Sequence, residues 1–458
     1  MLDLDLLFKP KNVAVIGASS NLNKLGGIVM ENLIKSNYNG EIFPVNPKGG
    51  VIMDKQVIPS IENLPESIDV GIIALDAEQS VSVIPKLGEK KIPFAIIFAG
   101  GFAEIRNFDL EKKLFEVCEK SNVKIIGPNC MGLWNGDPKV RFNASFMNIL
   151  PKITGKVSLL SQSGSLIALA IYVKLRMGKF ISIGNALNIS FQDMIPFLDN
   201  DSNTSVIALY IESFKDGRVF IEGLKKVSKP IITVIAGTTE AGQRSIASHT
   251  ASLSSNITLV TSLFNAYNII KVNSFEKLAS ISRAFELMKL PNNNNVIALS
   301  NAGGAVCLFT DACQEFGLRN DPLPDDLKQK LREIFPKQAP VNNPLDLTVT
   351  GWTKETIKSI MNILFNVKLH NYGIIVFIPV VAPYQNPIED ANLAIEFSKI
   401  SPLPFMTCLL AGDKVKPIIP ELDKAGIPYC ETIRETAEVL SIIYSWGNRK
   451  KPKFTSNK

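Results

Sequence analysis

The sequence predicts an α/β protein built on parallel sheets, and two observations carry this prediction. Short apolar runs alternate with amphipathic stretches along nearly the whole chain, as in units of strand, helix and strand. Three segments, which begin at Val13, Val157 and Val296, also share one arrangement, a buried strand followed by small residues and a helix. The 458 residues suit about three ordinary domains, so we expect one such segment to open each domain.

Stretches that break the pattern separate the three segments. Residues 151–155 contain proline and glycine, and residues 291–295 are a proline followed by four asparagines. We therefore predict three domains and a tail, which are residues 1–150, 151–293, 294–448 and a basic tail at 449–458.

Composition excludes several classes of protein. Hydrophobic residues make up 46% and charged residues 20%, so disorder is not the main state. The net charge of +6 is too mild for a nucleic-acid-binding surface. Six cysteines lie scattered without a C-x-x-C pair, and the acidic start Met1–Asp5 does not resemble a signal peptide. Polar residues interrupt the long apolar stretch at 157–173, so we expect a cytoplasmic protein that does not enter membranes.

Histidine is scarce, which narrows the possible chemistry. The chain has only His249 and His370, so a site built on several histidines is excluded and we expect no metal centre. His370 precedes a strand in a loop and receives no role.

The first strand–helix turn contains Gly17 and Ser19. In a parallel sheet this turn lies at the carboxyl edge, where free N–H groups and the helix dipole favour an anion. The glycines do not complete the G-x-G-x-x-G fingerprint, so a turn without a ligand and a loop that docks a pyrophosphate both remain open. Lys48 and Glu104 follow other predicted strands at the same edge, and Lys48 would reach the same phosphates.

The second strand–helix turn contains Gln162, Ser163 and Gly164. It lacks the Gly-Lys-Thr of a Walker loop and the Gly-x-Ser-x-Gly of a nucleophile elbow. A serine hydrolase would also need His249 as its base, so the sequence favours a helix N-terminus that offers N–H groups to a phosphate. Asn129 lies in a Gly-Pro-Asn turn, where turn chemistry and contact with a ligand are equally good explanations.

His249 follows a glycine-containing loop and has small neighbours in the sequence. A surface histidine is the ordinary interpretation, but the scarcity of histidine and these neighbours favour a nucleophile toward phosphorus. Glu212, at the end of a predicted strand, would hold the other ring nitrogen and fix the tautomer.

Taken together, these motifs resemble the α subunit of NDP-forming acyl-CoA synthetases, the ADP-forming acetyl-CoA synthetase type within the succinyl-CoA synthetase superfamily. The resemblance runs over nearly the whole chain, and its ordered landmarks are residues 13–19, 44–48, 127–132, 161–164, 184–193, 210–212, 248–250, 301–304 and 343–347. It implies an N-terminal CoA-binding Rossmann domain followed by two flavodoxin-like doubly wound domains.

The resemblance also implies roles for individual residues. His249 would be phosphorylated with Glu212 as its partner. The other expected contacts are Gly17, Ser19, Lys48 and Glu104 with CoA, Gln162, Ser163 and Gly164 with the phosphoryl group, and Asn129 and Asn185 with the substrate. The implied reaction interconverts acyl-CoA, ADP and phosphate with a carboxylic acid, CoA and ATP, through an acyl phosphate and a phosphohistidine.

The family supplies its ATP-grasp domain either fused or as a separate β subunit. We expect this chain to use a β subunit that binds ATP or ADP with Mg²⁺.

The chain departs from the family pattern at Ile235, Thr238 and Ala251, which surround the histidine in the sequence. These departures support a second hypothesis, a non-catalytic CoA- or nucleotide-sensing relative. A nicotinamide-dependent dehydrogenase is disfavoured by the incomplete fingerprint. The acid and the choice of ADP or GDP stay open.

Overall fold

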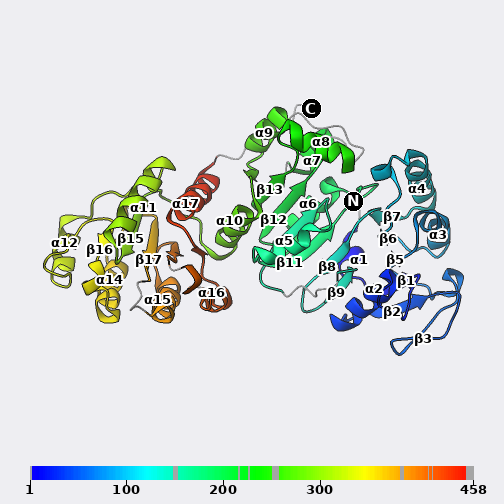
Figure 1. Ribbon diagram of the computed structural model, residues 1–458, viewed down its shortest axis with the longest axis horizontal. Coiled ribbons are helices and arrows are strands. Elements are labelled where there is room, and N and C mark those ends of the chain that lie inside the picture. The colour runs from blue at the N-terminus through cyan, green and yellow to red at the C-terminus, as the bar shows by residue number, and fades with distance from the viewer. Residues whose placement is uncertain are drawn as a thin grey trace. The chain divides into compact units, whose positions relative to one another are not determined.

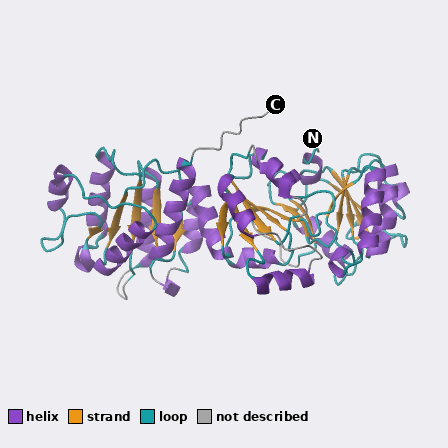
Figure 2. Cartoon of the chain, turned by 90° about the horizontal axis from the view of Figure 1, so that it is seen from above, coloured by secondary structure: helices purple, strands orange, loops and turns teal. Residues whose placement is uncertain are grey.

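The computed structural model describes most of the chain. The described residues are 3–147, 153–214, 217–224, 227–249, 257–381, 386–410, 412–414 and 416–449, with the side chains of 247–249, 257–259 and 413 excepted. The chain forms two compact units, Met1–Ala279 and Ser280–Lys458 (Figure 1). In Figure 2, helices flank the strands of the sheets. No helix in the described ranges combines the length and the apolar character needed to cross a membrane.

The first sheet has five parallel strands in the order β2, β1, β5, β6, β7. Its strands are β1 Asn12–Ile16, β2 Glu41–Val45, β5 Val70–Ile73, β6 Phe94–Ile97 and β7 Lys124–Ile126. Its helices are α2 Leu25–Lys35, α3 Ala77–Glu89 and α4 Phe108–Ser121, and a small hairpin joins β3 Val51–Ile52 to β4 Lys55–Gln56. Strands β5 and β6 are buried throughout, as expected for central strands covered on both faces.

The second sheet has seven strands in the order β14, β13, β12, β10, β11, β8, β9. Its strands are β8 Gly132–Asn135, β9 Phe142–Ser145, β10 Val157–Ser161, β11 Met177–Ser182, β12 Val206–Ile211, β13 Ile231–Ile235 and β14 Ile270–Val272. The accompanying helices are α5 Leu166–Tyr172, α6 Phe191–Asn200, α7 Gly217–Leu224, α8 Glu240–His249, α9 Ile257–Ala266 and α10 Phe275–Leu287. Strand β8 pairs antiparallel with both β9 and β11. The second sheet therefore includes residues from Gly132 onward, which precede the predicted domain boundary at residue 150.

The first two sheets belong to one unit because side chains link them. The short helix α1 (Asp5–Phe8) places the ring of Phe8 on that of Phe197, with 4.5 Å between ring centroids. Asn135 Nδ2 donates to the carbonyl of Phe8 at 2.8 Å. Asn32, on α2, donates to the carbonyl of Ser145 at 2.7 Å, so α2 covers the edge strand β9.

The second unit contains a third sheet of five parallel strands in the order β16, β15, β17, β18, β19. Its strands are β15 Val296–Ser300, β16 Leu345–Asp346, β17 Ile374–Ile378, β18 Phe405–Cys408 and β19 Tyr429–Cys430. Its helices are α11 Gly303–Glu315, α12 Asp325–Arg332, α13 Thr348–Gly351, α14 Lys354–Asn366, α15 Pro387–Ile400, α16 Ile419–Ala425 and α17 Ile433–Asn448. The predicted α/β class with successive parallel-sheet domains is confirmed.

The second unit begins before the predicted domain boundary at residue 293. The guanidinium of Arg283, near the end of α10, lies 4.0 Å from the ring centre of Tyr429. Arg283 is 5% exposed, so this cation–π contact is buried and joins the end of α10 to β19.

A buried carboxyl in this unit gives a test of the packing. Asp390, on α15, is 4% exposed and accepts a hydrogen bond of 2.9 Å from Trp352 Nε1. Its Oδ2 has no hydrogen-bond partner among the described residues. Burial raises the pKa of Asp390 to about 6, against a weaker opposing effect of the Trp352 hydrogen bond.

We expect Asp390→Asn to stabilise the protein at pH 8 and to have little effect at pH 4. The folded state binds the proton more tightly than the unfolded chain, so the stability that Asp390 contributes falls as the pH rises from about 4 to about 6. The cost at pH 8 is about 3 kcal/mol, and the amide keeps the oxygen that accepts from Trp352. Urea unfolding followed by tryptophan fluorescence measures it. Asp311→Asn makes the same chemical change at an exposed position on α11 and is the control. A less stable Asp390→Asn at pH 8 would contradict the account.

Candidate functional site

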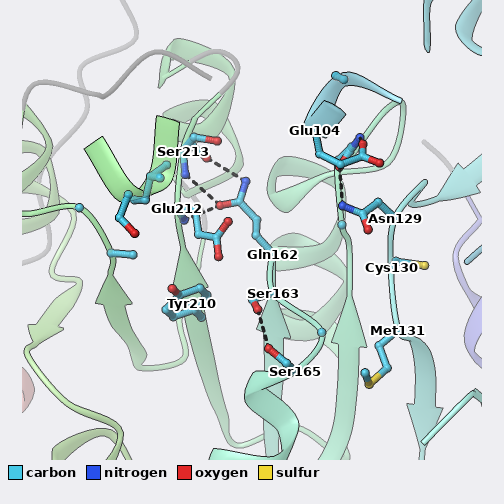
Figure 3. Close-up of a pocket in the computed structure, with 18 of the residues that line it drawn as sticks. Glu104, Asn129, Cys130, Met131, Gln162, Ser163, Ser165, Tyr210, Glu212 and Ser213 are labelled. Carbon is cyan, nitrogen blue, oxygen red and sulfur yellow. Dashed lines mark hydrogen bonds between the residues drawn. The ribbon is translucent and has the colours of Figure 1, made fainter. Parts of the chain in front are cut away.

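A cavity of about 970 Å³ lies within the first unit, at the carboxyl ends of strands from both of its sheets. The loops that follow β6, β7, β10, β11, β12 and β13 line it, together with Gly242, Ser245 and Ile246 of α8. Loops at this edge of parallel sheets are the usual place for a ligand in α/β proteins. Figure 3 draws Gln162, Glu212 and Ser213 on one side of the cavity, and Glu104 and Asn129 on the other.

Gln162 is bound to the loop that carries Glu212. Its side-chain Oε1 accepts from the backbone N–H of Glu212 at 2.5 Å and from that of Ser213 at 3.0 Å. Its Nε2 donates to the carbonyl of Ser213 at 2.9 Å. The side chain predicted to contact a phosphoryl group therefore holds the neighbouring loop.

Tyr210 lies beside Glu212 in the same cavity. Burial, the negative charge of Glu212 and a hydrogen bond with that carboxylate raise the pKa of Tyr210 to about 12. The phenol therefore keeps its proton at neutral pH and donates a hydrogen bond to the Glu212 carboxylate. This bond orients the side chain that the sequence predicts to act on His249.

Ser163 and Gly164 lie where the sequence predicted a phosphate-binding turn. Ser161 Oγ donates to the carbonyl of Ser163 at 2.6 Å, and the hydroxyls of Ser163 and Ser165 are 3.2 Å apart. A side chain at position 164 would come within 2.6 Å of Cβ of Met131, so only glycine fits this close approach. The turn leads into α5, and both residues line the cavity.

Across the cavity, three predicted residues meet in one hydrogen-bonded group. Asn185 Nδ2 donates to Oε2 of Glu104 at 2.7 Å and to Oε2 of Glu111 at 2.9 Å. Asn129 Nδ2 donates to Asn185 Oδ1 at 3.4 Å. The structure thus brings Glu104, Asn129 and Asn185 together and adds Glu111.

The Glu104 carboxylate also closes its own loop. Its Oε1 accepts from the backbone N–H of Gly101 and from that of Phe102. Burial alone would raise the pKa of Glu104, but the hydrogen bonds from Asn185 and from these amides outweigh it and lower the pKa. Glu104 is therefore an ionised group that fixes one wall of the cavity.

Backbone contacts lock the turn after β7 to the loop after β11. The N–H of Asn185 donates to the carbonyl of Pro128 at 2.9 Å, and that of Leu187 to the carbonyl of Gly127 at 3.0 Å. Gly184 has a φ of +53°, and a Cβ there would lie 2.3 Å from the Pro128 oxygen. Because only glycine allows this approach, Gly184 joins the edges of the two sheets.

Gly17, Ser19 and Lys48 lie at the same edge of the first sheet but do not line the cavity. Gly17 has a φ of +85°, and its amide donates to the carbonyl of Val45 at 3.0 Å. Asn46 donates to the carbonyl of Ala18 at 2.9 Å, which joins the loops after β1 and β2. Lys48 is exposed next to this junction.

His249 is the last residue of α8, and its side chain lies outside the described residues. The earlier residues Gly242, Ser245 and Ile246 of the same helix line the cavity. The helix that carries His249 therefore borders the cavity that contains Glu212. Ala251 also lies outside the described residues.

Sequence reasoning did not find two polar residues of the cavity. Glu111 lies on α4, whose charged residues look like an ordinary solvent-facing helix surface. Tyr210 belongs to the landmark at 210–212 but has no role assigned from the sequence. Their signal would have been position, since Glu111 follows Glu104 by seven residues and Tyr210 precedes Glu212 by two. Within the described ranges, His, Cys, Asp and Glu side chains form no group of three that could hold a metal ion.

Three family models match the chain in succession. They are a CoA binding domain at residues 11–135, a succinyl-CoA ligase like flavodoxin domain at 154–285 and a Ligase-CoA domain at 296–402.

Whole proteins are similar as well. The α subunit of ADP-forming acetate–CoA ligase II from Pyrococcus furiosus is 33% identical over 449 residues, which cover 95% of this chain and 96% of that protein. The ADP-forming acetate–CoA ligase of Methanocaldococcus jannaschii is 33% identical over 351 residues, which cover 75% of this chain and 49% of that protein. The structure of dinucleotide forming acetyl-coenzyme A synthetase 1 of Ca. Korarchaeum cryptofilum, in complex with phosphate and ADP, matches with a TM-score of 0.91 and 28% identity over 98% of this chain and 97% of that chain.

We expect Gly184→Ala to destabilise the first unit by about 1–3 kcal/mol, because a Cβ would collide with the Pro128 carbonyl at a positive φ. Thermal unfolding measures the loss. Gly217→Ala is the matched control, since a Cβ at Gly217 meets nothing within 4 Å. Equal melting temperatures for Gly184→Ala and the wild type would show that the two loops are not locked as described.

Proposed function

The chain belongs to the family of α subunits of ADP-forming acetate–CoA ligases, as its ordered motifs predicted, and from this we propose that it interconverts an acyl-CoA, ADP and phosphate with a carboxylic acid, CoA and ATP. One observation carries the proposal. The carboxyl edge of a domain that matches a CoA-binding family meets that of a second sheet in one cavity, which contains Glu212 and borders the helix of His249.

The reaction would proceed in three steps. Phosphate attacks the thioester carbonyl of the acyl-CoA, which gives an acyl phosphate and CoA. A ring nitrogen of His249 then takes the phosphoryl group and releases the carboxylate of the acid. Phosphohistidine finally passes the phosphoryl group to ADP and forms ATP. Phosphoryl transfer depends on a positioned nucleophile and stabilised oxygens more than on covalent chemistry.

Residues of the cavity have a role in each step. Glu212 would accept a hydrogen bond from the second ring nitrogen of His249, which fixes the tautomer and raises the basicity of the attacking nitrogen. The backbone amides of Ser163 and Gly164 would stabilise phosphoryl oxygens at the start of α5. Asn129 and Asn185 would hold the acyl group and are themselves held by Glu104 and each other.

The CoA phosphates would lie on the loops after β1 and β2. The hydroxyl of Ser19 is a suitable donor, the exposed Lys48 supplies positive charge, and Gly17, whose N–H is already bound to the Val45 carbonyl, would shape the loop. Glu104 is ionised and would repel phosphates, so we propose that it faces the uncharged thiol arm of CoA within the cavity.

We propose that a β subunit with an ATP-grasp domain provides the nucleotide and Mg²⁺. The Pyrococcus furiosus relative is named as a subunit, and the match covers only about half of the Methanocaldococcus jannaschii protein. The Korarchaeum structure contains phosphate and ADP. Mg²⁺ would neutralise the nucleotide phosphates when bound.

We further propose a cytoplasmic location, because all six cysteines are free thiols and five of them are buried.

A CoA- or nucleotide-sensing role without catalysis is the second candidate. It is supported only by the unusual residues Ile235, Thr238 and Ala251, whereas the relatives of full length are ligases.

The acid is to be identified by measuring turnover over short-chain, branched, aryl and hydroxy acids, with ADP and GDP compared.

We predict that His249 carries a phosphoryl group during turnover. The chain, its β subunit and ATP labelled at the γ-phosphate should give protein-bound label that is stable in base and lost in acid. His249→Ala should abolish the label, and His370→Ala should keep it. A wild type that binds CoA without acquiring label would favour the sensing role.

We also predict that Lys48→Met weakens CoA binding by about threefold to tenfold, because one charge-assisted contact with a phosphate is lost. The loss should shrink at high salt. Isothermal titration at two salt concentrations measures both effects. Lys112→Met, an exposed lysine on α4 with 76% of its side chain accessible, is the matched control. An unchanged dissociation constant for Lys48→Met would remove Lys48 from the CoA site.

A further inference from the structure

The side chain of Gln162 continues the hydrogen bonding of β12 beyond the point where β10 and β12 stop pairing. Strands β10 and β12 pair in register as far as Ser161 and Tyr210, and the backbone N–H of Gln162 makes one more bond to the Tyr210 carbonyl at 3.2 Å. Beyond that point β10 turns away toward α5. The amide groups of Glu212 and Ser213 then pair with the Gln162 side chain in place of a neighbouring strand.

The hydrogen-bonding capacity of Gln162 is almost used up by this arrangement. A glutamine oxygen accepts two hydrogen bonds, and both come from the backbone N–H groups of Glu212 and Ser213. The Nε2 group has two N–H bonds, one of which is donated to the Ser213 carbonyl. These partners also fix which end of the amide is oxygen. At most one N–H is left for a ligand, which does not suit the cradle for three phosphoryl oxygens that the motif suggested.

From this geometry we propose that Gln162 is a positioning residue, which holds Glu212 at the end of β12 so that its carboxylate is fixed relative to the helix of His249. The inference rests on the proposed function in one respect, that Glu212 serves His249. Tyr210 complements it, since its hydroxyl donates to the Glu212 carboxylate. Gln162 thus fixes the backbone of Glu212 and Tyr210 its side chain.

Positioning of this kind affects rate more than binding. A displacement of a catalytic group by about 1 Å costs on the order of a hundredfold in rate even when the substrate binds as before. A direct phosphate ligand would behave differently, because its loss would raise the KM for phosphate.

The test uses two variants of Gln162 and a matched control. Gln162→Met keeps the length of the side chain and loses all three hydrogen bonds. Gln162→Glu keeps the oxygen that accepts from the two amides and loses the donor to Ser213. Gln79→Met makes the same chemical change at an exposed position on α3, away from the cavity.

Hydrogen exchange, measured on the full chain, tests the contact between the Gln162 side chain and the two backbone amides directly. In Gln162→Met, exchange at the amides of Glu212 and Ser213 should accelerate about tenfold, because their acceptor is gone. Gln162→Glu should fall between that variant and the wild type, and Gln79→Met should match the wild type. Unchanged exchange in Gln162→Met would overturn the inference whatever the activity.

Kinetic measurements with the β subunit then test the effect of this contact on the rate. Formation of phosphohistidine should slow about tenfold or more in Gln162→Met, while the KM for phosphate stays within about twofold. In a Glu212→Gln background the same change should add no further loss, because Gln162 acts through Glu212. A raised KM for phosphate with an unchanged rate, or losses that multiply in the double variant, would overturn the inference.

The two claims fail in different ways. A wild type that forms no phosphohistidine contradicts the proposed function, and with it the purpose assigned to Gln162. The exchange measurement does not depend on turnover, so it still shows whether Gln162 holds Glu212. A labelled wild type with a fully active Gln162→Met contradicts only the inference.

Discussion

The cavity depends on one constraint, the close contact between the turn after β7 and the loop after β11. Gly184 must lack a side chain for the Pro128 carbonyl to approach, and backbone N–H groups from the loop then pair with carbonyls of the turn. This contact brings the carboxyl edges of two sheets together. Asn129 and Asn185 are 56 positions apart and meet only because of it. The site is therefore a consequence of how the two sheets are joined.

The two walls of the cavity are rigid for different reasons. On one wall, Glu104 and Glu111 share the amide of Asn185, and Glu104 also binds backbone amides. On the other wall, Gln162 extends the hydrogen bonding of β12 to Glu212. Hydrogen bonds within the protein hold each wall. A preorganised site of this kind suits phosphoryl transfer, where the protein contributes position and charge.

The sequence predicts the fold well and the site unevenly. Buried strands are apolar runs, so the α/β class follows from them, as does the position of Glu212 at a strand end. A sequence does not say which sheet a hairpin joins, so the strands at 132–145 were expected in the first domain. It also does not say where a side chain points. The contacts of Gln162 with the loop of Glu212, and of Asn185 with Glu111, therefore could not be predicted.

The central proposal is that His249 takes the phosphoryl group from an acyl phosphate with Glu212 as its partner. Incubation of the chain without its β subunit, with acetyl phosphate labelled in the phosphoryl group, tests it most directly. The account predicts acid-labile, base-stable label that peptide mapping assigns to His249, and its loss in Glu212→Gln. Label on another residue, or equal labelling of Glu212→Gln, would contradict the account.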